Sequence, residues 1–298
     1  MARVNRAIDH VVAHLAEPLP LEEVARVAAF SPFHFHRIFR AVTGETLAAF
    51  VKRVRLERAA HLISHRKDAR LTDIALACGF SSSSDFTRSF KAQYGMPPSA
   101  FDSDAFRAPR REAMIERDIP EEGRHRVRTL PVAENPDGFE ARLIDLPART
   151  VAYIRVMQGY EGGLGRALER LTDWATKRGL ADGQWLGYQW DDPEIVPREK
   201  CRYDAGLEVP AGTDVEPQGD VMLARFEPMR VAEVDIAGPI DLELRAIHWL
   251  YFSWLPRSGC APAHAPMFEA WNGRPFAHGG SHFELRLHLP VVDAREPL

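Results

Sequence analysis

Apolar positions in the first hundred residues recur every three to four residues, which is the spacing of a helix with one buried face. In the first such stretch, Ile8, Val11, Val12 and Leu15 fall at i, i+3, i+4 and i+7. The pattern predicts helices over residues 3–16, 21–28, 32–43, 46–66 and 72–78. A further helix is predicted to begin within the serines at 81–84 and to end at Gly95.

Residues 21–95 show the same arrangement twice, which indicates two helix-turn-helix units joined by the long helix. Each unit has a short helix, a tight turn at Ala29-Phe30 or Gly79-Phe80, and a second helix. Ser31 and the proline after it have the pattern of an N-cap and a first helical residue, and we expect Thr72 to cap the short helix of the second unit. A phenylalanine pair four residues apart anchors each second helix: Phe35 with Phe39, and Phe86 with Phe90.

The second unit carries a long motif that resembles the DNA-binding domain of AraC-type transcriptional regulators, and the resemblance covers residues 1–101. In this sequence the motif is Asp73-Ile-Ala, then Gly79-Phe80-Ser81-Ser82-x-Ser84-x-Phe86-x-Arg88-x-Phe90-Lys91, then Gly95-x-Pro97. The chain departs from the family where Asp85 replaces a common aromatic residue and where Asp102 replaces a frequent basic one. The resemblance implies that the partner is double-stranded DNA.

The outward faces of the two second helices carry the residues that we expect to contact DNA. They are Phe33, His34, His36, Arg37 and Arg40 in the first unit, and Ser83, Ser84, Thr87, Arg88 and Lys91 in the second. Arg37 and Arg88 have the chemistry to bond both guanine acceptors, although a phosphate contact or an intramolecular salt bridge is the alternative for each. A connecting helix of about 20 residues spans roughly 30 Å, close to the ~34 Å between successive major-groove faces of DNA.

The connecting helix also carries basic residues on its other face, namely Lys52, Arg53, Arg55 and Arg58. Phosphate contacts and a simple solvated helix face are equally compatible with them. We expect the domain to end near residue 103 and a linker to follow over 104–137. Within the linker, Glu112–Arg117 could form a short helix and Val127–Leu130 a strand.

A second domain over residues 138–293 alternates short strands with amphipathic helices. The order strand, helix, strand, strand occurs twice, which predicts a duplicated α+β unit. The fold class is therefore multidomain, with an all-α N-terminal domain and an α+β C-terminal domain. The predicted elements are 139–156, 160–178, 185–191 and 201–209 in the first half, and 222–236, 240–255, 267–271 and 282–291 in the second.

Several segments of this domain resemble the GyrI-like small-molecule-binding domain: Leu186-Gly-Tyr188-Gln-Trp190-Asp191-Asp192-Pro193, Leu255-Pro256-x-Ser258-Gly259, Phe268-Glu269 and Phe283-Glu284-Leu-Arg-Leu-His-Leu-Pro290-Val291. An AraC-type domain followed by a GyrI-like domain is the arrangement of Rob-like regulators. The resemblance implies an apolar, often cationic effector held between aromatic rings and a glutamate, which we place at Glu284. The expected ring residues are Tyr188, Trp190, Phe268 and Trp271, and packing in the core is the alternative for them.

Composition agrees with a cytoplasmic protein. Charged residues make up 27% and hydrophobic residues 45% of the chain, and no apolar run reaches the ~18 residues of a membrane span. No signal peptide is evident, and the three cysteines have no close pair. Residues 1–108 contain 15 Lys+Arg and 11 Asp+Glu, net +4, and the remainder contains 23 and 31, net −8. The N-terminal third alone therefore has a charge that suits nucleic acid.

We interpret the chain as a ligand-responsive transcription regulator and not as an enzyme, with RNA polymerase as a further candidate partner. We expect no cofactor and no metal, because the histidine pairs His10/His14 and His61/His65 lack a third ligand. Two alternatives remain. The pocket could hydrolyse reactive electrophiles, with Glu284 or Glu269 activating water, or the second domain could act only as a protein-interaction module.

Overall fold

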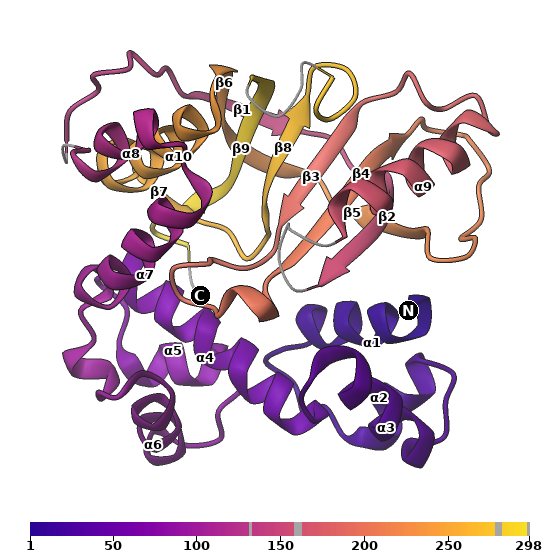
Figure 1. Cartoon of the computed structure of the whole chain (residues 1–298). Coiled ribbons are helices and arrows are strands. Elements are labelled where there is room, and N and C mark those ends of the chain that lie inside the picture. Colours follow the sequence, from indigo (N-terminus) through magenta and orange to yellow (C-terminus); the bar gives the residue numbers. More distant parts are fainter. Residues whose placement is uncertain (131–132, 158–162, 278–281, 297–298) are drawn as a thin grey trace. The chain divides into compact units, whose positions relative to one another are not determined.

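The computed structural model describes residues 1–130, 133–157, 163–277 and 282–296, and the chain divides into two compact units between Arg107 and Ala108. The first unit is helical, as predicted (Figure 1). Its elements are α1 (Ala2–Ala13), α2 (Leu21–Val27), α3 (Pro32–Thr43), α4 (Leu47–His65), α5 (Leu71–Ala77), α6 (Ser83–Tyr94) and the 3₁₀ turn η1 (Pro98–Ala100).

Local capping explains where these helices start and stop. The side chains of Ser31, Thr46 and Ser82 accept hydrogen bonds from the backbone amides of His34, Ala49 and Asp85, at the starts of α3, α4 and α6. Gly44 and Gly95 end α3 and α6 in the left-handed conformation. The prediction for Thr72 is wrong: α5 begins one residue earlier, at Leu71, and has no side-chain cap.

The phenylalanine pairs lie in the core of the first unit, as predicted. Phe35, Phe39, Phe86 and Phe90 are all at most 1% exposed. The two tight turns have the same backbone shape, since Gly79 has φ 78° and Ala29, a residue with a β-carbon, has φ 54°. The repeat therefore extends to the backbone of the turns, and in the first unit an alanine occupies a conformation that favours glycine.

The expected linker is helical. Helix α7 (Ser103–Asp118) carries the chain into the second unit, and α8 (Glu121–Arg128) follows it. The strand considered for Val127–Leu130 is wrong, because Val127 lies in α8 and packs with Ile115 and Ile119. Ile115 in α7 and Ile119, directly after its end, are four residues apart and form a short apolar stripe within a strongly charged segment.

The described strands of the second unit form one nine-stranded antiparallel sheet, in the order β1-β6-β9-β8-β3-β4-β2-β5 with β7 beside β9. The strands are β1 (Arg142–Leu146), β2 (Arg149–Met157), β3 (Trp185–Gln189), β4 (Arg202–Val209), β5 (Met222–Phe226), β6 (Met229–Gly238), β7 (Cys260–Pro262), β8 (Met267–Trp271) and β9 (Phe283–Asp293). Short turns lie between them: the 3₁₀ turn η2 (Arg198–Lys200), the π turn η3 (Leu250–Trp254) and α11 (Leu255–Ser258).

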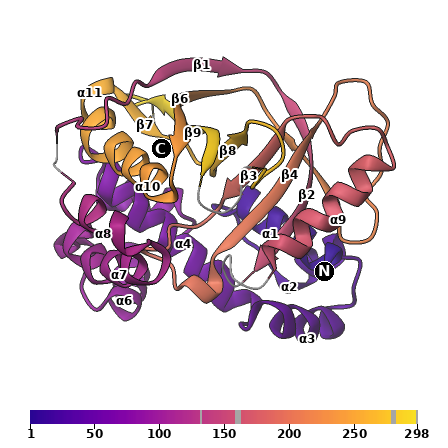
Figure 2. The same ribbon diagram turned by 45° about the horizontal axis from the view of Figure 1, so that its top comes forward.

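Helices α9 (Leu164–Thr176) and α10 (Ile240–Trp249) pack on the same face of this sheet and share one hydrophobic core with it (Figures 1 and 2). The predicted duplication is confirmed, because β2-α9-β3-β4 and β6-α10-β8-β9 repeat the same order. The two halves meet at β3 and β8, and each half also gives its leading strand to the other: β1 pairs with β6, and β5 with β2. The predicted start of α9 at Tyr160 lies outside the described residues.

The sheet curls toward the face that the helices leave open. Phe226 on β5 and Tyr188 on β3 lie three strands apart in the sheet order, yet their ring centroids are 4.6 Å apart. Three strand spacings of a flat sheet would cover roughly 14 Å. The open face is therefore concave.

Candidate functional site

The predicted DNA-contacting residues lie on the surfaces of α3 and α6. His36 is half-buried and the others are exposed: Phe33, His34, Arg37, Arg40, Ser83, Ser84, Thr87, Arg88 and Lys91. Phe33 is 69% exposed, which is unusual for a large apolar side chain, and the Arg37 guanidinium lies 5.8 Å from its ring centroid. An arginine and an aromatic ring thus stand together at the start of α3.

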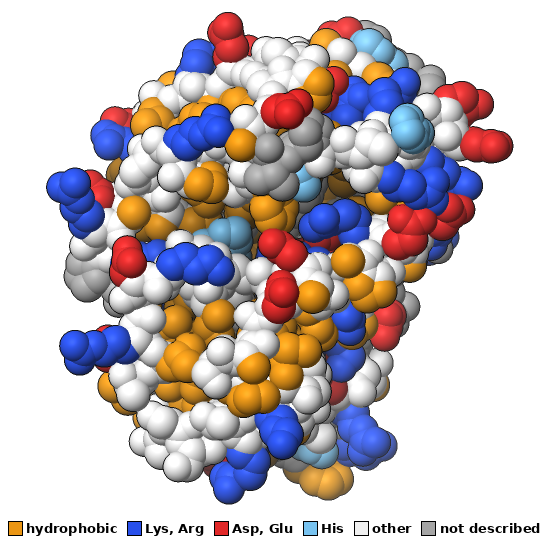
Figure 3. Space-filling view, turned by 90° about the vertical axis from the view of Figure 1, so that its left-hand side faces the viewer, with side chains coloured by type: hydrophobic (Ala, Val, Ile, Leu, Met, Phe, Trp, Pro, Cys, Tyr) orange, Lys and Arg blue, Asp and Glu red, His pale blue; other side chains and the backbone are white. Residues whose placement is uncertain are grey.

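Helix α6 differs from α3, because its arginine, Arg88, forms a salt bridge within the helix. Arg88 Nη2 donates to Asp85 Oδ1 at 3.1 Å, so the intramolecular salt bridge considered for Arg88 is present. The pair is exposed, and such pairs contribute little to stability. Asp85 nevertheless neutralises the charge that Arg88 would bring to DNA. On the face viewed in Figure 3, basic and acidic side chains are likewise interspersed.

The basic residues of α4 have different environments. Arg53 is 5% exposed and is bound by Glu45 and Glu57, so neither a solvated face nor a phosphate contact describes it. Arg55 Nε and Nη2 donate to the backbone carbonyls of Leu15 and Glu17, which ties α4 to the loop before α2. Lys52 is exposed, and it lines a groove of about 820 Å³ between the two helix-turn-helix units.

The five predicted ligand residues do not meet in one place. Tyr188 and Phe268 pair across β3 and β8 on the concave face, with ring centroids 5.1 Å apart. Trp190 follows β3 and donates to Asp204. Trp271 belongs to the core under the helices. Glu284 lies at the start of β9; its side chain is 38% exposed and forms an ion pair with His282 at 3.3 Å. Glu284, the predicted effector-binding glutamate, is therefore not a buried carboxylate.

A buried carboxylate pair lies instead on the helix-covered face. Glu243 on α10 and Glu269 on β8 are 4% exposed each. The Gln189 amide donates to both, at 3.3 Å to Glu243 and 2.6 Å to Glu269. The Tyr203 hydroxyl and the Trp271 indole nitrogen donate to Glu269 Oε2 at 2.8 and 2.9 Å. Burial raises the pKa of both carboxyl groups, and for Glu243 the neighbouring Glu269 charge raises it further.

A glycine makes room for this cluster. Gly187 pairs directly with Glu269 across β3 and β8, where the two halves of the domain meet. A β-carbon at position 187 would overlap the Tyr203 hydroxyl and approach Glu269 Oε2 to 2.6 Å. Where the two halves of the sheet meet, one half therefore contributes the acidic side chain of Glu269 and the other contributes Gly187, which has no side chain. Sequence reasoning named Glu269 only for hydrolysis and did not identify Glu243.

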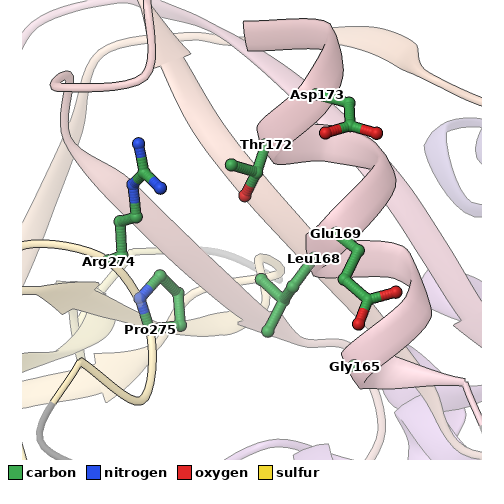
Figure 4. Close-up of a pocket in the computed structure, with 7 residues that line it drawn as sticks. All are labelled: Gly165, Leu168, Glu169, Thr172, Asp173, Arg274 and Pro275. Atoms are coloured by element: carbon green, nitrogen blue, oxygen red, sulfur yellow. The ribbon is translucent and has the colours of Figure 1, made fainter. Parts of the chain in front are cut away.

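A separate surface pocket of about 320 Å³ lies beside α9. Figure 4 shows Arg274 and Pro275 across from Leu168 and Thr172 of that helix, and Glu169 and Asp173 also line the pocket. None of the five predicted ligand residues lines it. In the part of the chain that the structure describes, the helices lack the length and apolar character that crossing a membrane requires.

Comparisons with known proteins match the helical unit and the sheet unit separately. A helix-turn-helix domain model matches residues 24–104, and the GyrI-like small-molecule-binding domain model matches residues 139–286. Among curated relatives, HTH-type transcriptional regulator YbfP of Bacillus subtilis is 41% identical over 98 residues, which are 33% of each chain. The right origin-binding protein of Escherichia coli is 39% identical over 89 residues, 30% of each chain. The match thus spans about a third of the length of these relatives.

A solved structure that matches part of this chain is the DNA-binding domain of AdpA in complex with a target DNA. It is 28% identical, covers 37% of this chain and 97% of that one, and has a TM-score of 0.33. The two family matches fall on the helical unit and on the duplicated sheet. The chain belongs to the AraC-type helix-turn-helix regulators that carry a C-terminal GyrI-like domain.

Proposed function

We propose that the chain is a sequence-specific DNA-binding transcription regulator whose second domain binds an apolar, cationic effector. The observation that carries the DNA part is the exposed polar face of α3, with Arg37 beside an exposed Phe33. Arginine reads guanine through two donors, and an apolar ring can contact a thymine methyl group. In α6, Arg88 is engaged by Asp85, so α3 contributes more of the specificity.

Selection of genomic fragments by the purified protein, with excess random DNA at ~0.15 M salt, tests this proposal. The expected result is an enriched site with two boxes about one helical turn apart. Arg37→Ala should weaken specific binding by ~1–3 kcal/mol and relax the base preference. Arg6→Ala, at an exposed position of α1, is the matched control. An equal loss on random DNA would make Arg37 a phosphate contact, and no enriched site at all would refute the proposal.

For the effector we propose the Glu243–Glu269 cluster as the binding site. Burial of both carboxyl groups and the repulsion between their charges disfavour the doubly ionised pair, and a cation that enters the site would favour that form. The surrounding Tyr203 and Trp271 rings supply cation–π contacts. Because the carboxyl groups are buried, side chains around them must move to admit a ligand.

This proposal predicts that binding of a lipophilic cation releases a proton. Titration calorimetry with tetraphenylphosphonium in buffers of different ionisation enthalpy measures the number of protons released. The affinity should rise with pH, and Glu269→Gln should lose both the affinity and the proton release. Glu284→Gln is the matched control, since that carboxylate is half-exposed and paired with His282. Unchanged binding in Glu269→Gln would refute this site.

Hydrolysis of electrophiles remains a second candidate, because a buried glutamate with a raised pKa suits a general base. Of the two residues considered for it, Glu269 has this environment and Glu284 does not. Turnover of a small epoxide or activated ester that disappears in Glu269→Gln, while the variant stays folded, would establish it. Binding without turnover would leave the regulator as the sole function.

A further inference from the structure

The duplicated sheet contains two equivalent strand pairs with different chemistry. In each half an arginine follows a proline by two residues: Arg149 after Pro147, and Arg230 after Pro228. Arg230 on β6 lies opposite Asp145 on β1, and its Nε and Nη2 donate to the two carboxylate oxygens at 2.8 and 2.9 Å. Arg149 on β2 lies opposite Phe226 on β5. An aromatic ring thus stands where the other half has a carboxylate.

As a consequence, the Nε and Nη2 edge of the Arg149 guanidinium lacks the carboxylate that the same edge of Arg230 binds. Its Nε and Nη2 are buried and form no hydrogen bond to any described residue. Other arginines of this domain donate from both Nε and Nη2 to one carboxylate, as in Arg111–Glu194, Arg155–Asp204 and Arg202–Asp191. Arg149 as a whole is half-buried, but two buried guanidinium N–H donors without an acceptor are costly, so the geometry calls for an oxyanion at this edge.

The surroundings of Arg149 supply the rest of a site on the concave face. Its guanidinium lies over Phe268, 4.3 Å from the ring centroid. Tyr188 stacks on Phe226 with an interplanar angle of 5°. The Tyr188 hydroxyl is buried and, within the described ranges, lacks a hydrogen-bond partner. The Arg149 guanidinium and the Tyr188 hydroxyl, both donors, therefore lie beside the aromatic rings of the concave face. The Tyr188 ring also lies 5.1 Å from the Phe268 ring, so Arg149 and Tyr188 contact the same ring. Burial raises the pKa of Tyr188, while the Arg149 charge acts to lower it.

The carboxylates near Arg149 do not act as its counter-charge. Asp204 is held by Arg155, and Glu233 is held by Arg142 and His288. Glu208 lies near enough to act on Tyr188, but no hydrogen bond or ion pair joins it to Arg149 among the described residues. His288 Nδ1 is also buried without a described partner, and the Arg149 charge acts on that ring. A water molecule could satisfy the donors but would leave the guanidinium charge uncompensated.

We propose that Arg149, the Tyr188 hydroxyl and the rings of Phe226 and Phe268 form a second binding site, specific for a small aromatic carboxylate. The carboxylate takes the place that Asp145 occupies in the other half of the domain. Its ring packs on Phe226, which is only half-buried on the edge strand β5. This site is on the opposite face of the sheet from Glu243 and Glu269 and selects the opposite charge, so it stands independently of the proposed effector site.

Titration calorimetry of the full-length protein with benzoate, and with benzamide as the neutral isostere, tests the proposal. Benzoate should bind saturably and benzamide should not. Arg149→Met should weaken benzoate binding roughly tenfold or more, and Tyr188→Phe should weaken it several-fold, since it removes one donor and keeps the ring. Arg230→Met is the matched control, because it removes the equivalent arginine that already has its carboxylate, and it should bind benzoate as the wild type does.

Phe226→Asp provides the sharpest variant, because it places a carboxylate opposite Arg149 as Asp145 stands opposite Arg230. It should abolish benzoate binding without lowering the melting temperature. If Arg149→Met fails to fold, Arg149→Lys keeps the charge but not the two-donor edge, and together with Tyr188→Phe it still decides the question. Absence of saturable benzoate binding, or equal binding by wild type and Arg149→Met, would overturn the proposal.

Discussion

Replacing Gly187 with alanine should destabilise the second domain, because the added methyl group has no space. The new β-carbon would overlap the Tyr203 hydroxyl, and Glu269 Oε2 would lie 2.6 Å away. Both neighbours belong to the same hydrogen bond, from Tyr203 to Glu269 at 2.8 Å. The methyl group can be accommodated only if Tyr203 moves aside and this bond breaks.

Two contributions set the size of the effect. Overpacking a filled core costs about 1–3 kcal/mol, and losing a buried hydrogen bond to a charged or acidic group costs about 1.5–3 kcal/mol. Because the two overlap in part, we expect a loss of about 2–5 kcal/mol. For a domain of this size that lowers the melting temperature by roughly 4–20 °C.

A double-mutant cycle identifies the cause. Tyr203→Phe removes the hydroxyl that the methyl group meets, so Gly187→Ala should cost less in that background than in the wild type. The expected coupling is about 0.5–3 kcal/mol, measured by urea denaturation of all four proteins. Equal costs in both backgrounds would show that Tyr203 does not restrict position 187, and a wild-type melting temperature for Gly187→Ala would refute the packing argument altogether.

Three further variants test other parts of the structure. Glu243→Gln should raise the unfolding free energy at pH 8 more than at pH 4, because the raised pKa of Glu243 makes the wild type lose stability as the pH rises through that pKa; an equal effect at both pH values would contradict this. Burial lowers the pKa of His288 to about 4, so the wild type should lose stability as the pH falls from ~6.5 to 4, and denaturation curves of His288→Gln should show a flatter pH dependence. Ala29→Gly should stabilise the first unit by about 0.5–1 kcal/mol, since Ala29 has φ 54°, and thermal unfolding that shows a loss instead would exclude strain at this turn.

Features that depend on neighbouring residues along the chain could be predicted from the sequence. The caps at Ser31 and Ser82, the phenylalanine pairs and the repeated strand order all follow from local spacing. Only Glu112–Arg117 of helix α7 was considered as a helix, because the apolar stripe of α7 is short. The burial of Arg53 was missed although Glu57 lies four residues away.

The residues predicted to bind the ligand do not lie together, because their positions depend on which face of the sheet each residue takes. Phe268 and Trp271 are an odd number of positions apart on one strand, so they face opposite sides, and alternation alone could have separated them. The pairing of Gly187 with Glu269, and the approach of Glu243 from α10, depend on contacts between distant segments. No local pattern specifies such contacts.

The exchange of leading strands between the two halves of the sheet has a consequence for how this domain can be cut or assembled. Because β1 completes the half that contains β6, and β5 completes the half that contains β2, each half on its own has an unpaired edge and lacks a strand. A chain divided after Val209 should yield two fragments that fold only in each other's presence. Two identical chains that exchanged their first strands in a dimer would have the same strand pairing. Gene fusion of such a swapped dimer is therefore a simple origin for the duplicated domain.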